Sequence, residues 1–104
     1  MRILNKLVRD KIPTIIENKD EKSVTRILNN SEYETELRKK LQEEVNEFLQ
    51  DDNCDELADI MEVVYALAKT KDMSHEELEE IRKKKYEERG GFEEKIFLEK
   101  VEDK

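Results

Sequence analysis

The stretch EEVNEFLQDDNCDELADIMEVV, which runs from Glu43 to Val64, decides how this chain folds. It contains two segments of helical character separated by Asp51-Asp52-Asn53, which predicts a turn because short Asx side chains compete with helical backbone hydrogen bonds. Helices joined by so short a turn pack antiparallel. The stretch therefore predicts a helical hairpin, and its acidic side chains stand next to its most apolar residues.

The composition of the chain favours helices throughout. Of 104 residues, 46% are charged, 2 are glycine and 1 is proline. Glu, Lys, Leu and Arg are good helix formers, whereas Gly and Pro are poor ones. We therefore expect one all-α domain over residues 1–104, a three- to four-helix bundle that can include short strands at its termini. Because only 36% of the residues are hydrophobic and the domain is small, we also expect self-association to supply burial.

Capping residues set the expected helix boundaries. Asp10 can cap a short first helix that has Pro13 in its first turn. Ser74-x-x-Glu77 forms a capping box for the last helix, which Gly90 ends. Residues 20–30 predict a loop that can contain a short strand. Residues 95–98 predict either a short strand or a segment packed on the bundle. The helices are expected over Lys11–Asn18, Ser31–Gln50, Asp55–Lys71 and His75–Arg89.

The net charge and the single cysteine limit which partners and which cellular compartment the sequence favours. A net charge of −8 argues against a long nucleic acid as partner, although a small nucleotide carried by a metal ion remains compatible with it. Cys54 has no second cysteine with which to form an intramolecular disulfide. No segment is apolar for long enough to act as a signal peptide or to span a membrane. We therefore expect a cytoplasmic, soluble protein.

Helical geometry indicates where the carboxylates point. At about 100° per residue, Glu44 falls beside Leu37 at the edge of an apolar stripe, Glu47 lies one step further round, and Glu43 lies towards the polar side. In the next helix, ten of the twelve residues from Leu57 to Ala68 are apolar, which predicts a helix buried on most sides. The stripe of the first helix consists of Leu37, Leu41, Val45, Phe48 and Leu49.

Glu56 and Asp59 project into the apolar arc of the second helix, with Glu56 between Val63 and Leu67. Burying an unpaired carboxylate is very costly, so such groups are neutralised, paired or bound to a metal. One interpretation is a solvated acidic face or ion pairs, for example with Lys40. The other is a cleft in which the acids of both helices bind Mg²⁺ or Mn²⁺, since these cations prefer oxygen ligands.

Five basic residues are candidates for binding phosphate. Lys85 and Arg89 lie four residues apart on the last helix, where the helix dipole also favours cations. Arg offers bidentate contacts to phosphate, which suits a triphosphate held in the cleft. Arg9 and Lys11 are further candidates that can equally pair with the acidic surface. Lys40 can neutralise a neighbouring glutamate or contact phosphate.

The two acidic groups together resemble the signature E-E-x-x-E followed by E-x-x-D of the all-α nucleoside triphosphate pyrophosphohydrolases, the MazG-like superfamily. The stretches NKLVRDKIP (Asn5–Pro13) and KYEERGGF (Lys85–Phe92) resemble elements of its phosphoribosyl-ATP pyrophosphohydrolase-like branch. The resemblance covers nearly the whole chain. The residues that match the signature are Glu43, Glu44, Glu47, Glu56 and Asp59.

The resemblance implies that Glu44, Glu47, Glu56 and Asp59 bind Mg²⁺. Glu43 would support the metal ligands or act as an auxiliary base. We expect Glu44 to take a proton from the attacking water, because it lies nearest the apolar edge, where its basicity can be raised. The family hydrolyses the α–β phosphoanhydride bond of a nucleoside triphosphate to the monophosphate and pyrophosphate, and its members are dimers or dimers of dimers. Two alternatives stay open: a phosphoribosyl-ATP pyrophosphohydrolase of histidine synthesis, and a non-catalytic helical dimerisation module with salt-bridged acids.

Overall fold

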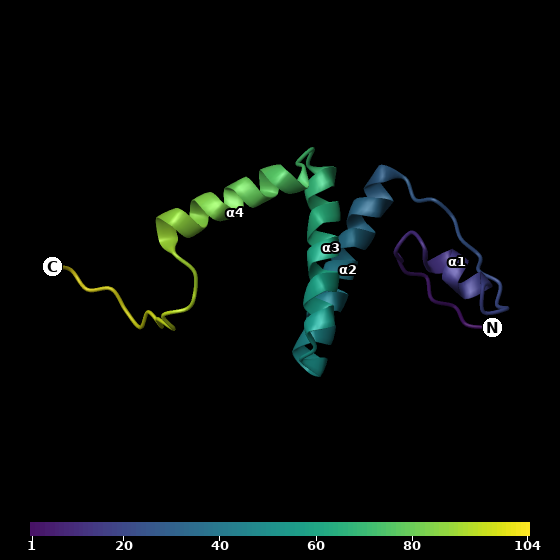
Figure 1. Ribbon diagram of the computed structural model, residues 1–104, viewed down its shortest axis with the longest axis horizontal. Helices are drawn as coiled ribbons and strands as arrows, with labels where there is room; N and C mark the ends of the chain where they lie inside the picture. Colours follow the sequence, from purple (N-terminus) through teal and green to yellow (C-terminus); the bar gives the residue numbers. More distant parts are fainter.

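The computed structural model describes residues 1–104 and consists of helices joined by irregular segments (Figure 1). The all-α prediction is confirmed, and the short terminal strands are wrong. Ile96 and Phe97 in the tail are 80% and 85% exposed, and no neighbouring strand offers the tail backbone hydrogen bonds. The four helices are α1 (Ile12–Glu17), α2 (Asn30–Asp51), α3 (Cys54–Thr70) and α4 (His75–Arg89).

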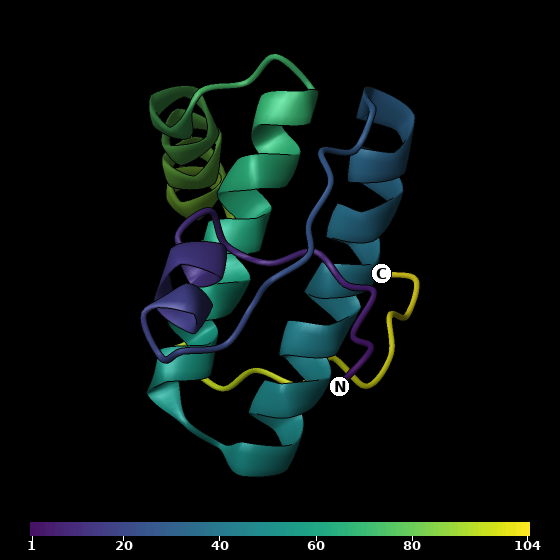
Figure 2. The same ribbon diagram turned by 90° about the vertical axis from the view of Figure 1, so that its right-hand side faces the viewer.

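The predicted turn between α2 and α3 forms, but it begins at Asp52 because Asp51 still belongs to α2. Asp52 ends α2 in the left-handed conformation, with φ 54° and ψ 41°, and donates its N–H to the carbonyl of Phe48. Asn53 then caps α3, since its side-chain oxygen accepts the N–H of Asp55 at 2.9 Å. As a result α2 and α3 lie side by side and run in opposite directions (Figure 2).

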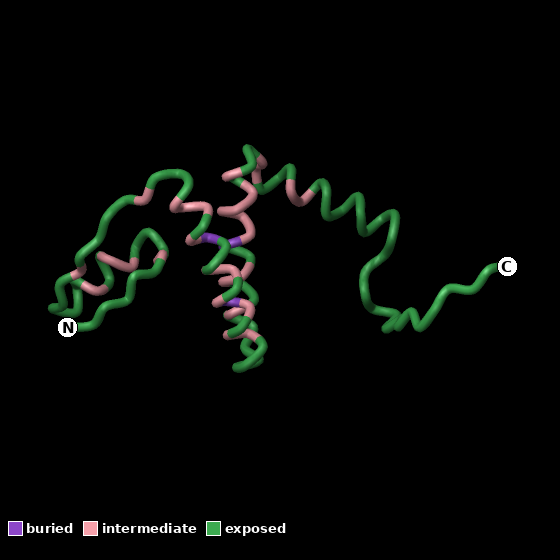
Figure 3. The backbone as a smooth tube through the Cα atoms, turned by 180° about the vertical axis from the view of Figure 1, so that it is seen from behind, coloured by how far each residue is buried: buried purple, intermediate pink, exposed green.

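The interior of the molecule is the seam between α2 and α3. Only three residues of the chain are buried, Leu37 and Glu44 on α2 and Val63 on α3 (Figure 3). A carboxylate is thus one of the most enclosed side chains in the protein. Since charged side chains are almost never fully buried unless they are paired, Glu44 marks the place where function should be sought.

The helix α4 projects away from this hairpin (Figure 1). Its predicted capping box is present, with Ser74 and Glu77 bonding each other's backbone N–H groups. It ends at Gly90, whose φ of +81° favours glycine. Among the helices α4 contacts α3 alone, and every residue from position 81 to the end of the chain is exposed. The four predicted helices are present, and within the single chain they form a helical hairpin from which α4 projects.

The chain is much more extended than a compact domain of its size. It measures 67 × 32 × 22 Å and has a radius of gyration of 18.6 Å, against about 13 Å for a compact chain of this length. The helix α3, predicted to be buried on most sides, has Leu57 and Met61 42% and 52% exposed. Among the helices, only α2 and the start of α4 cover α3, which leaves its apolar face with Leu57 and Met61 open.

The first helix is shorter than predicted and its cap differs. Lys11 occupies the N-cap position of α1 and makes no side-chain capping bond, so the prediction that Asp10 caps this helix is wrong. Pro13 lies in the first turn, as expected. The helix α1 packs on none of the other helices. None of the four helices combines the length and apolar character that a bilayer crossing requires.

Candidate functional site

Three carboxylates of α2 converge at the middle of the hairpin. Glu43, Glu44 and Glu47 each place one oxygen within 4.8 Å of the other two. Residues three and four positions apart share a helix face, so the spacing E-E-x-x-E brings these side chains together by local geometry alone. The three residues form the centre of an acidic cluster, to which further carboxylates contribute.

Glu44 is the most enclosed member, with 6% of its surface exposed. Its Oε1 lies 3.2 Å from the Nζ atom of Lys40, one turn earlier on the same helix. Its Oε2 is buried and has no hydrogen-bond partner. Leaving a buried polar atom unpaired costs about 1–3 kcal/mol, and more for a charged group. The Oε2 atom of Glu44 therefore lacks a compensating donor or positive charge of its own within the chain.

The helix α3 adds Glu56 and Asp59 to the cluster. The pKa of Glu56 rises to about 7, first because burial withdraws its carboxyl group from water and then because Asp51 lies close enough to share its proton. The negative charges of Asp51, Glu47 and Asp59 raise the pKa of Glu56 further. The Oε2 atom of Glu56 is also buried without a partner. The acids of the two helices thus act on one another, as the antiparallel hairpin predicted.

Mutual repulsion is also visible at Glu47. The pKa of its carboxyl group is raised mainly by the charge of Glu44, with further contributions from burial and from Glu43. Lys40 partly offsets this repulsion. Crowded carboxylates with raised pKa values indicate an excess of negative charge, and a divalent cation would relieve it.

Lys40 is the basic residue placed most firmly in the cluster. Its side chain is 18% exposed, and its Nζ atom lies 3.5 Å from Glu43 and 3.2 Å from Glu44. A sequence separation of three and four residues on α2 explains both contacts. One ammonium group between two carboxylates leaves Glu47 and Glu56 without a nearby cation of their own.

The N-terminal segment lies across the cluster. The Nη2 atom of Arg9 is 3.0 Å from Oδ1 of Asp59, and the Nζ atom of Lys6 is 3.8 Å from Oε1 of Glu43. Sequence reasoning singled out Arg9 and missed Lys6, although the two cations stand three residues apart in the same motif. Lys11, a further candidate, is exposed and forms no ion pair.

Asp51 is a second residue that sequence reasoning missed. We interpreted it as part of the turn, but α2 continues through it, so that its side chain approaches Glu56. The signal lay in its spacing, since Asp51 stands four residues after Glu47 and therefore on the same helix face. The cluster thus contains six carboxylates: Glu43, Glu44, Glu47, Asp51, Glu56 and Asp59.

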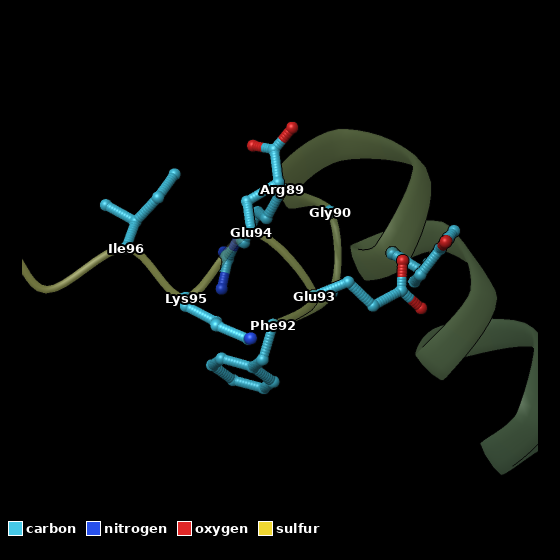
Figure 4. Close-up of a pocket in the computed structure, with 9 residues that line it drawn as sticks. Arg89, Gly90, Phe92, Glu93, Glu94, Lys95 and Ile96 are labelled. Carbon is cyan, nitrogen blue, oxygen red and sulfur yellow. The ribbon is translucent and has the colours of Figure 1, made fainter.

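The structure does not bring Lys85 and Arg89 to this cluster within one chain. Both residues are exposed on α4, whose C-terminal end lies away from the α2–α3 pair (Figure 1). Arg89 instead borders an open hollow formed by the turn that follows the helix (Figure 4). That hollow is lined by Tyr86, Arg89, Gly90, Gly91, Phe92, Glu93, Glu94, Lys95 and Ile96.

Comparison of the chain with protein-family models, with curated proteins and with solved structures finds no match. The chemistry of the cluster rests on its donor atoms, which are all carboxylate oxygens. Such a set suits Mg²⁺ or Mn²⁺ better than softer metals. The buried Oε2 atoms of Glu44 and Glu56 fit the same interpretation, because neither has a hydrogen-bond partner.

Proposed function

We propose that this protein is a Mg²⁺-dependent nucleotide pyrophosphohydrolase of the MazG-like kind. It would cleave the α–β phosphoanhydride bond of a nucleoside triphosphate and release the monophosphate and pyrophosphate, a house-cleaning activity. The observation that carries the proposal is the unpaired, buried Oε2 of Glu44 inside a cluster of carboxylates from two helices. The spacing of those carboxylates, which resembles the family signature, supports it.

Four carboxylates would hold the metal, Glu44 and Glu47 from α2 with Glu56 and Asp59 from α3. When bound, Mg²⁺ supplies positive charge to the phosphate oxygens and acidifies water. Glu44 would accept the proton of the attacking water, and Glu43 would assist as an auxiliary base. Mn²⁺ has similar ligand preferences and should substitute.

Basic residues beside the cluster would orient the triphosphate. Lys40 already lies between two of the carboxylates, and Arg9 reaches Asp59 from the N-terminal segment. Lys11 follows Arg9 by two residues and extends the same basic surface. Such cations stabilise the negative charge that phosphoryl transfer moves between oxygens.

Lys85 and Arg89 fit the same role only if they come from another copy of the chain. The end of α4 is far from its own cluster in Figure 1, and the apolar face of α3 is uncovered. A twofold dimer would cover that face and carry the α4 of one protomer towards its partner. We therefore propose a homodimer or a dimer of dimers in which α4 completes the neighbouring site.

One structural feature favours a different function. The ion pairs Lys40–Glu44 and Arg9–Asp59 would also be expected in a non-catalytic dimerisation module with salt-bridged acids. The two functions differ in their response to metal. An enzyme with unpaired buried carboxylates gains thermal stability in millimolar Mg²⁺, because a ligand that binds only the folded state stabilises it. A salt-bridged module gains no more from Mg²⁺ than from an equal ionic strength of Na⁺.

The function is tested by measuring pyrophosphate release from a panel of nucleoside triphosphates, with phosphoribosyl-ATP included. The panel identifies the substrate class, and activity on phosphoribosyl-ATP alone would assign the protein to histidine synthesis instead. The control is the double variant Glu44→Gln/Glu47→Gln, which keeps side-chain size but removes two anionic ligands. Release of pyrophosphate by the wild type at a rate no greater than that of this control would reject the proposal.

A further inference from the structure

Two basic side chains of the N-terminal segment pair with carboxylates on different helices of the acidic cluster. Arg9 contacts Asp59 on α3 at 3.0 Å, and Lys6 lies 3.8 Å from Glu43 on α2. The segment that carries them crosses from one helix of the hairpin to the other (Figure 2). A cation that binds Glu43 or Asp59 therefore competes with these two side chains.

The segment is held in place by weak contacts. The side chains of Lys6 and Arg9 are 45% and 56% exposed, and exposed ion pairs contribute little to stability. Between them only Leu7 and Val8 are half-buried, and α1, which follows, packs on no other helix. The segment can thus leave the carboxylates while the α2–α3 seam stays intact.

The cluster beneath the segment still lacks a cation. Glu44 is nine-tenths buried, and its Oε2 has no partner, whereas Lys6 and Arg9 contact other carboxylates. The segment therefore covers the cluster without satisfying its most enclosed oxygen. A metal ion at Glu44 would add positive charge close to both basic side chains and repel them from their present partners.

We propose that the N-terminal segment Asn5–Lys11 is a cationic lid whose ion pairs exchange during binding. In the metal-free chain, Lys6 and Arg9 pair with Glu43 and Asp59. When a metal ion and a polyphosphate occupy the cluster, the same two side chains contact phosphate oxygens. The guanidinium of Arg9 offers two parallel donors for this purpose, and Lys6 acts as a point charge. The proposal rests on the function proposed above. It adds a phosphate-binding role for Lys6 and a coupling between the binding of metal and the binding of phosphate.

The proposed exchange predicts that removing Lys6 or Arg9 changes the affinity for the metal ion and the affinity for polyphosphate in opposite directions. Because the ion pairs exist only without metal, removing one of them favours the metal-bound state. Because the same side chain contacts phosphate afterwards, its removal weakens polyphosphate binding. An ion pair that merely stabilises the fold would leave both affinities unchanged and would lower only the melting temperature.

The test uses the full chain, with Mn²⁺ alone and then inorganic tripolyphosphate at saturating Mn²⁺ as probes. Free Mn²⁺ is measured by electron paramagnetic resonance, and tripolyphosphate binding by calorimetry. We expect Arg9→Gln and Lys6→Gln each to tighten Mn²⁺ binding about two- to fivefold, the size of an exposed ion pair. Each should weaken tripolyphosphate binding about tenfold, as for loss of a charged hydrogen bond. Arg2→Gln is the matched control, since Arg2 pairs at 3.0 Å with Glu21, outside the cluster.

A second readout follows movement of the segment, which through-space charge effects would not cause. Trypsin cleavage after Lys6 should become faster with Mn²⁺ and slow again when tripolyphosphate is added. Cleavage after Lys22, in the exposed loop beyond α1, should stay constant and serves as the internal control. The proposal is overturned if neither ligand changes the rate of cleavage after Lys6. It is also overturned if the Arg9 and Lys6 variants bind Mn²⁺ and tripolyphosphate as Arg2→Gln does. A wild type that binds no Mn²⁺ would instead reject the proposed function itself, before any variant is compared.

Discussion

Arg9 and Asp59 lie fifty residues apart in the sequence, yet their side chains form a hydrogen bond of 3.0 Å. The contact joins the N-terminal segment to α3, the helix that provides two of the six carboxylates of the acidic cluster. Asp59 is 41% exposed at its side chain, so the pair lies at the mouth of the cluster and not in its interior. The most enclosed carboxylate, Glu44, pairs with Lys40 through its Oε1 atom, and its Oε2 atom has no hydrogen-bond partner.

Glu56→Gln should abolish metal-dependent turnover while leaving the metal-free fold equally or more stable. The substitution removes a half-buried acid that is crowded by Asp51, Glu47 and Asp59, and it also removes a hard anionic ligand. Asp59→Asn should abolish turnover as well, but at a small loss of stability because it breaks the pair with Arg9. Melting curves and initial rates on the same preparations check both statements. Near-normal activity in either variant would place the metal elsewhere.

The stability of the metal-free protein should fall as the pH rises towards and through 7. The pKa of Glu56 is about 7 in the fold against an ordinary value of 4.5, so between these values the folded state binds more protons than the unfolded state. Glu56 therefore favours folding at low pH, and this contribution is lost as the carboxyl group ionises. Melting temperatures from pH 5 to pH 8 in EDTA measure the effect.

Two variants separate this effect from other titrations. Glu56→Gln should remove most of the slope, since no proton is left to lose at that position. Asp51→Asn should move the slope to lower pH, because a charge that raises the pKa of Glu56 is gone. An unchanged pH profile in both would show that other groups dominate.

The protein should sediment as a species larger than its 12.5 kDa chain at micromolar concentration. Leu57 and Met61 stand exposed on α3, and their burial between two copies would be favourable at about 25 cal/mol per Å². Met61→Glu should shift the protein towards monomer because it places a charge in that interface. Val24→Glu, at a loop position that is 90% exposed, is the control and should not change the sedimentation. A wild type that remains monomeric would contradict the dimer.

Arg89→Ala should lower kcat/KM about 10- to 100-fold, the loss of one charge-assisted phosphate contact. If α4 completes the site of the partner, mixing Arg89→Ala with the inactive Glu56→Gln should restore activity. In a freely exchanging twofold dimer, about a quarter of all sites would then contain both intact residues. No recovery after subunit exchange would mean that Arg89 does not act across the dimer. A lower melting temperature with unchanged kinetics would assign it a capping role instead.

Local signals in the sequence predicted all four helices, with boundaries that differ from the structure by one residue at most ends. The Ser74–Glu77 capping box and the turn at Asp52-Asn53 act within a few residues, and both appear in the structure. Asp10 failed as a cap because the turn before Pro13 places Lys11 at that position. The direction of α4 could not be predicted, since no residue pattern fixes how an exposed helix with one neighbour is oriented.

The candidate site was predictable to the extent that it depends on helix periodicity. The position of Glu44 at the edge of an apolar stripe predicted a side chain turned partly inwards, and it is among the three buried residues. Lys6 was missed because an irregular segment carries no periodicity that could place it over α2. Asp51 was missed because its residue type favours turns, although α2 extends through it.

Phosphorus NMR of the reaction products tests the central claim most directly, with the most active nucleoside triphosphate as substrate and Mg²⁺ present. We predict that the α, β and γ signals are replaced by a monophosphate and pyrophosphate in equal amounts, and that EDTA stops the reaction. Glu44→Gln/Glu47→Gln should give no products under the same conditions. Release of a diphosphate and orthophosphate, or a rate that EDTA leaves unchanged, would contradict the account.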